Sequence, residues 1–365
     1  DDLIISYANG AFIITDNSGL DISTTIAGVT GNGTSTITVP NTGITSILVN
    51  TLEGDDKFIV DFSEDTINIP INYNGGDQNN SMPGDILTIT GGTFATVISN
   101  FTNANDGSIL LDGSQINYTG LEPIDMSGST VNDLIFNLPN SANNAVLEND
   151  TSTGYTQFYS NNGTFESMVF SNPTNSLTIN GGTQAETISV QGVDAAFDAD
   201  LTINGGVDDY VNFQTNPTNV GTGNITVNTL AISVTEDIST TGTGLISMTS
   251  DSNIIINSAA SVTAENGNIT LLANGNTSGD YDGVLIWNGS MVETTGSGNI
   301  LFTGTAQSLG TNSFNYGVVV EGNAQVITSG TGAITFNGTG ASTGENSNNG
   351  VQISFGASVT SNGGD

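Results

Sequence analysis

The C-terminal part of this 365-residue chain consists of tandem copies of one unit. Residues 283–316 and 317–349 are two copies at an offset of 34, and a third copy occupies residues 350–365. At that offset, similar residues coincide without a gap, including Val292/Val326, Ile300/Ile334, Phe302/Phe336 and Gly304/Gly338. A fixed period of this size is typical of proteins that stack copies of one structural unit. We therefore expect these paired apolar residues to lie over one another inside a shared core.

A shorter spacing precedes these copies. Short apolar patterns follow Gly223, Gly244, Gly267, Gly298 and Gly332, which are separated by steps of 21, 23, 31 and 34 residues. Steps of 21 and 23 fit one turn of a β-helix, and the longer steps fit the same turn with an inserted loop. The string LTINGG also recurs at residues 177–182 and 201–206, a step of 24.

A longer duplication lies in the N-terminal part. Residues 46–76 align without a gap with residues 176–206 at an offset of 130. The sequence therefore predicts two related β modules, at residues 1–123 and 124–220, followed by repeats over residues 221–365.

The local pattern favours strands. Apolar and polar residues alternate in segments such as LTIT and NITV, β-branched residues are frequent, and Gly, Asn, Asp and Ser separate the segments. No stretch has a convincing helical pattern. We expect an all-β fold, a repetitive and mostly parallel β-solenoid of the right-handed β-helix type. For the N-terminal half, β-sandwich-like modules are an open alternative, because they also consist of short strands and turns.

The charge balance excludes several function classes. The chain has 36 Asp and Glu, one Lys or Arg (Lys57), no His and no Cys, which gives a formal net charge of -35. Binding to nucleic acid requires Lys and Arg for the phosphates, so it is excluded. Imidazole and thiol catalysis, zinc knuckles and disulfides are absent for the same compositional reason. No apolar run approaches the ~20 residues of a membrane span.

We expect no enzymatic activity. Paired carboxylates hydrolyse glycosides without His, and Asp55-Asp56 or Asp208-Asp209 are the candidate pairs. Adjacent residues of one strand point to opposite faces, however, so neither pair can converge on one substrate.

Acidic, glycine-rich turns suggest calcium binding, because Ca²⁺ prefers several carboxylate and carbonyl oxygens on a tight turn. GGTQAETIS (181–189) and GGVDDYVNF (205–213) resemble, in degenerate form, the nonapeptide of calcium β-rolls. The alternative is that Asn, Asp and Gly are there for the turn itself. The candidate calcium ligands are Asp55, Asp56, Glu186, Asp208, Asp209, Asp280 and Asp282.

The strings GNITL, LTINGG and INSAASVTAENGNITLLANG (256–275) resemble the β-strand-repeat regions of giant bacterial surface proteins, including filamentous-haemagglutinin-like adhesins. The resemblance is clearest over residues 220–365 and implies architecture, with no catalytic or binding residue to carry over. It implies a secreted or cell-surface segment of a larger protein, which forms a stiff adhesive or structural fibre.

Two kinds of partner follow from this interpretation. A fibre associates with further repeats of the same chain or with copies of itself. The alternative function is a binding module that holds surface glycans or calcium in the inserted loops 275–283, 305–316 and 339–349.

Overall fold

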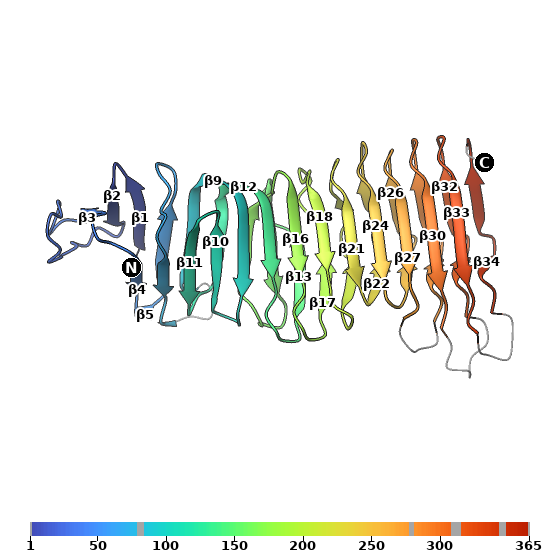
Figure 1. Ribbon diagram of the computed structural model, residues 1–365, viewed down its shortest axis with the longest axis horizontal. Helices are drawn as coiled ribbons and strands as arrows, with labels where there is room; N and C mark the ends of the chain where they lie inside the picture. The colour runs from blue at the N-terminus through green and yellow to red at the C-terminus, as the bar shows by residue number, and fades with distance from the viewer. Residues whose placement is uncertain (1, 79–83, 277–280, 308–314, 343–347, 364–365) are drawn as a thin grey trace. The chain divides into compact units, whose positions relative to one another are not determined.

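The computed structural model describes residues 2–78, 84–276, 281–307, 315–342 and 348–363. Within these residues the fold is all-β, contains no helix, and pairs its strands mostly in parallel. The chain divides into two compact units, of which the first comprises Asp1–Pro139 and Asp150–Thr174. The second comprises Asn140–Asn149 and Asn175–Asp365. Each unit is described separately below (Figure 1).

The strands of the first unit are β1 (Asp2–Ala8), β2 (Ala11–Asp16), β3 (Thr36–Pro40), β4 (Ile47–Asn50), β5 (Glu53–Gly54), β6 (Lys57–Asp61), β7 (Ile71–Asn74), β8 (Asp77–Gln78), β9 (Ile86–Phe101), β10 (Gly107–Leu111), β11 (Ser114–Thr119), β12 (Ile124–Asn137), β14 (Tyr155–Ser160) and β15 (Met168–Ser171).

The first unit contains two long parallel ladders and the short parallel pair β5–β8. One runs β1–β6–β9–β12–β15, and the other runs β4–β7–β11. Antiparallel pairing joins β1 to β2 and β2 to β3 at one end of the first ladder. These parallel ladders differ from the antiparallel sheets of a β-sandwich, which argues against that alternative for this part of the chain.

The strands of the second unit are β13 (Asn144–Asn149), β16 (Ser176–Asn180), β17 (Thr187–Val190), β18 (Asp200–Asn204), β19 (Tyr210–Phe213), β20 (Thr218–Asn219), β21 (Ile225–Thr229), β22 (Ala231–Val234), β23 (Ile238–Thr240), β24 (Ile246–Ser250), β25 (Ile254–Ile256), β26 (Ser261–Ala264), β27 (Ile269–Ala273), β28 (Val284–Ile286), β29 (Met291–Thr294), β30 (Ile300–Thr305), β31 (Val318–Val320), β32 (Gln325–Thr328), β33 (Ile334–Thr339), β34 (Val351–Ile353) and β35 (Ser358–Ser361).

Three parallel ladders run through the second unit, whose strands lie side by side in Figure 1. They are β16–β18–β21–β24–β27–β30–β33, then β13–β17–β19–β22–β25–β28–β31–β34, and finally β20–β23–β26–β29–β32–β35. Each full turn therefore contributes one strand to each ladder.

The register confirms the repeats found in the sequence. Leu177, Leu201, Ile225, Ile246, Ile269, Ile300 and Ile334 occupy one position in seven successive strands. Phe302 pairs with Phe336, and their ring centroids are 5.2 Å apart. The 130-residue duplication has the same basis, because Ile47 pairs with Ile71 in the first unit as Leu177 pairs with Leu201 in the second.

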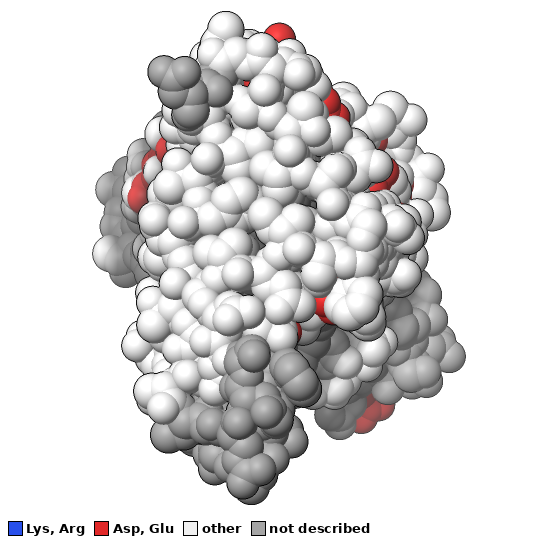
Figure 2. Space-filling model, turned by 90° about the vertical axis from the view of Figure 1, so that its right-hand side faces the viewer, with Lys and Arg blue, Asp and Glu red and all other residues white. Residues whose placement is uncertain are grey.

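The last turn of the second unit leaves core positions uncovered. Val326 is fully buried, but Val359, its partner on the next strand, is 37% exposed. Ile353 and Phe355 are 47% and 75% exposed. Figure 2 views this end of the molecule, where only a few scattered acidic side chains are visible and no basic one. Phe336 stacks on Phe302 as expected, but it is only half-buried, whereas Phe302 is fully buried.

Candidate functional site

Four acidic residues of the first unit lie at equivalent positions just before successive strands of one ladder. Asp56 and Asp85 directly precede β6 and β9, and the register pairs Lys57 with Ile86. Glu122 and Glu166 each lie two residues before β12 and β15. The register there pairs Ile124 with both Leu87 and Met168. Adjacent positions in such a stack are ~4.8 Å apart. We call Asp56, Asp85, Glu122 and Glu166 the acid ladder.

Backbone hydrogen bonds hold the acid ladder together. The Asp56 amide donates to Asp85 Oδ1 at 2.8 Å, and the Glu122 amide donates to the Asp85 carbonyl at 2.7 Å. Asp85 is completely buried, and its Oδ2 has no hydrogen-bond partner. Burial raises the pKa of Asp85, and the nearby Asp56 carboxylate adds to the increase.

Glu166 is the most strongly affected acid of the ladder. It is buried, and its Oε1 accepts hydrogen bonds from the Ser167 amide at 2.6 Å and the Ser167 hydroxyl at 3.0 Å. Burial raises the pKa of Glu166 to about 8, and the neighbouring Glu122 contributes to the increase. Glu166 therefore holds its proton at neutral pH, in a chain whose composition offers almost no cation.

A second pair of carboxyl groups lies in the second unit. The Glu186 amide donates to Asp209 Oδ1 at 2.8 Å. Glu186 Oε1 accepts hydrogen bonds from Asn143 Nδ2 at 2.9 Å and from the Gly182 amide at 2.7 Å. Burial, followed by the Asp209 carboxylate, raises the pKa of Glu186 to about 7.

The geometry of this pair suits a shared proton. Glu186 Oε2 is buried and accepts no hydrogen bond from the described residues. A Cβ atom placed on Gly181 would lie 2.5 Å from Glu186 Oε2 and 2.8 Å from Asp209 Oδ2, so the two oxygens approach the same small space. A protonated Glu186 can donate to Asp209 there.

The structure distributes the predicted calcium ligands over separate places. Asp56 lies in the acid ladder, and Asp55 is exposed beside it. Glu186 and Asp209 form the buried pair, and Asp208 is exposed beside them. Asp280 lies outside the described residues. Asp282 Oδ1 accepts a hydrogen bond from the Tyr316 amide at 2.7 Å, and burial raises the pKa of Asp282 to about 6.

No group of three or more acidic residues suited to a metal ion occurs in the described part of the chain. Calcium binding therefore stays a prediction. The loop alternative also stays a prediction, because residues 277–280, 308–314 and 343–347 of the three inserted loops lie outside the described residues.

A mixed polar hollow lies elsewhere in the first unit. It has a volume of about 330 Å³, and its lining includes Lys57, Asp125, Asp150 and Tyr155. Ser127 and Ser152 amides donate to the carboxylates of Asp125 and Asp150. The sequence analysis missed this hollow, because its residues come from separate strands and loops. The single signal that could have pointed to it is Lys57, the one basic residue of the chain.

In the part of the chain that the structure describes, no helix has the length and apolar character to cross a membrane. Comparison with family models, with curated proteins and with solved structures returns no match to this chain.

Proposed function

We propose that this chain is a structural segment of a larger bacterial surface protein, located outside the cell. In this proposal the strands form a β-solenoid of the right-handed β-helix type, which acts as a stiff, adhesive or structural rod. The observation that carries the proposal is the in-register stacking of Leu177, Leu201 and the equivalent residues of the next five strands. Six steps of ~4.8 Å make this ladder about 29 Å long.

Three features support a mechanical role. Each turn of the second unit contacts the next through parallel ladders, so load passes from turn to turn through many hydrogen bonds. Inward side chains such as Ile246, Ile269 and Val262 are fully buried. The high negative charge keeps such a rod soluble and discourages lateral association.

Single-molecule pulling tests the proposal. The chain contains no Cys, so Thr183→Cys and Asn362→Cys provide two unique handles on exposed residues of the second unit. Turns of 21–34 residues should then detach one after another. Each event should release roughly 70–120 Å of chain, at 3.3–3.6 Å per residue. Release of the whole unit in one event would contradict a rod of separable turns.

The polar hollow around Lys57 favours a second candidate function, the binding of surface glycans. Tyr155 supplies a ring for a sugar face, and Lys57, Asp125 and Asp150 supply hydrogen-bonding groups around it. The hollow is small, about 330 Å³, and therefore suits one or two sugar residues.

Tyr155→Ala should weaken binding to any neutral glycan that an array identifies, by about tenfold or more, because it removes the stacking surface. The control is Tyr210→Ala, since Tyr210 is 49% exposed and does not line the hollow. Titration of both variants with the same glycan gives the comparison. Equal affinity in the two variants, or no binding to the array, would exclude this site.

A further inference from the structure

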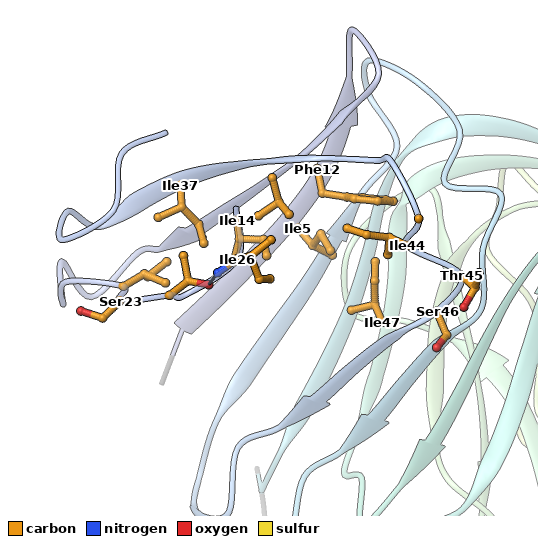
Figure 3. Close-up of a pocket in the computed structure, with 14 residues that line it drawn as sticks. Ile5, Phe12, Ile14, Ser23, Ile26, Ile37, Ile44, Thr45, Ser46 and Ile47 are labelled. Atoms are coloured by element: carbon orange, nitrogen blue, oxygen red, sulfur yellow. Dashed lines mark hydrogen bonds between the residues drawn. The ribbon is translucent and has the colours of Figure 1, made fainter. Parts of the chain in front are cut away.

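An apolar hollow of about 550 Å³ opens at the end of the first unit that contains β1–β4 (Figure 3). Fourteen residues line it, of which nine are Ile, Val or Phe and none is charged. Figure 3 shows Phe12, Ile37, Ile44 and Ile47 pointing toward the same space from different strands and loops. Several of these apolar groups remain partly exposed, Ile26 by 56%, and an open apolar surface of this kind is typical of an interaction site.

The hollow exists because the two ladders of the first unit have unequal lengths. Beyond β1, the first ladder continues with β2 and β3. The second ladder stops at β4, which within the described residues pairs only with β7. The hollow therefore lies where a further strand beside β4 would lie, across from β2 and β3.

The outer edge of β4 has no strand paired with it within the described residues. The amides of Ile47 and Thr51 donate to the carbonyls of Pro70 and Asn74 on the β7 side. Successive residues of a strand direct their amides to opposite sides, so the Leu48 amide faces away from β7.

Burial along the second ladder shows how much the missing strand would cover. Tyr118 of β11 and Tyr73 of β7 are 1% and 2% exposed at one inward position. Val49 of β4, the next residue at this position, is only half-buried. The apolar core of the second ladder is therefore partly exposed at β4, its last strand.

We propose that this hollow is the docking site for an extended strand of a partner polypeptide. The strand adds to the free edge of β4 and inserts alternate apolar side chains into the hollow. Main-chain hydrogen bonds supply the affinity in this mode of recognition, and the pocket supplies specificity. The inserted side chains are uncharged, because a charge buried against an apolar lining loses its hydration without gaining a partner.

The probe is a labelled, acetylated and amidated peptide with the sequence TSILVNT, a copy of residues 45–51 in which the residues equivalent to Ile47 and Val49 point to one face. Fluorescence anisotropy should show saturable binding to the whole chain. Ile44→Asp and Ile26→Asp place a charge in the lining, and each should weaken binding at least about tenfold. Leu20→Asp is the matched control, because Leu20 is 60% exposed on the same end and does not line the hollow.

Leu48→Pro separates strand addition from simple apolar binding. It removes the outward amide of β4 and leaves the lining intact. Peptide binding should weaken about tenfold in this variant, whereas binding of the neutral dye Nile red should not change. Circular dichroism checks that each variant keeps its strands.

Several results would overturn the proposal. These are failure of the peptide to bind, equal binding by the wild type and Leu48→Pro, and binding of Nile red without binding of the peptide. Self-association of the chain in ultracentrifugation that Ile44→Asp abolishes would identify a second copy as the occupant instead. None of these results bears on the pulling experiment, so the proposed structural function is tested separately.

Discussion

Gly267→Ala is expected to destabilise the second unit by about 3 kcal/mol or more, because the new methyl group has no space between two turns. A Cβ atom on Gly267 would lie 1.9 Å from the carbonyl oxygen of Gly244, and one on Gly298 would lie 1.9 Å from that of Gly267. Each glycine thus touches the backbone of the equivalent glycine one turn away. In each case the nearest atoms belong to the backbone of the neighbouring turn, which cannot rotate away as a side chain can. Only separation of the two turns can therefore relieve the clash.

The measurements are the thermal midpoint and hydrogen exchange. Exchange should increase first in β24 and β27, the two strands that follow Gly244 and Gly267. Gly298→Ala should have the same effect one turn farther along.

Gly113→Ala is the matched control, since no atom lies within 4 Å of its Cβ position. There the substitution should be neutral or stabilise by up to about 1 kcal/mol through the unfolded state. Similar losses at Gly113 and Gly267 would contradict the explanation by stacking.

Glu166→Gln is expected to stabilise the first unit at neutral pH and to reduce the dependence of its stability on pH. The fold raises the pKa of Glu166 from the ordinary 4.5 to about 8 through burial. Below pH 4.5 the group is protonated in both the folded and unfolded states, so its burial does not lower the free energy of unfolding through ionisation. As the pH rises toward 8, the unfolded state releases this proton and the folded state keeps it, so stability falls.

The expected gain for Glu166→Gln at pH 7 is on the order of 3 kcal/mol, from ~1.4 kcal/mol for each pKa unit. The amide keeps an oxygen to accept the hydrogen bonds of Ser167. The measurement is the denaturant midpoint of the wild type and of Glu166→Gln at about pH 5, 7 and 8.5. Glu186, with a pKa of about 7, should give the second unit a similar loss of stability over a narrower range of pH.

Glu64→Gln is the control for a general effect of charge, because Glu64 is exposed and its removal reduces the net charge by the same amount. If both substitutions stabilise the protein equally, repulsion between the 36 acidic residues explains the trend and burial of Glu166 does not.

The repeats show what could be inferred before the structure. The offset of 34 pairs Val292 with Val326 and Phe302 with Phe336, as the ladders do. The glycine steps predicted the ladder from Ile225 to Ile334. These inferences succeeded because a stacked turn repeats its buried residues at the spacing of the chain itself.

The candidate calcium ligands show what the sequence pattern could not predict, namely the surroundings of each acidic side chain. The turn composition around Asp208-Asp209 resembled a metal loop. In the structure Asp209 is buried against Glu186 and Asp208 is exposed. Asp208 lies in a turn and Asp209 directly precedes β19, so their neighbours depend on how the turn folds against the adjacent strands. The local pattern could not reveal which acid meets an acid of another turn.

The sequence by itself therefore determined the strand content, the parallel stacking and the register of the repeats, because identical environments select similar residues at regular spacing. Only the tertiary structure decided which acids share a position and where the core is left open. The acid ladder joins Asp56, Asp85, Glu122 and Glu166 through loops of unequal length, so no period connects them. The apolar hollow beside β4 depends on where one ladder ends and another continues, which no local pattern encodes.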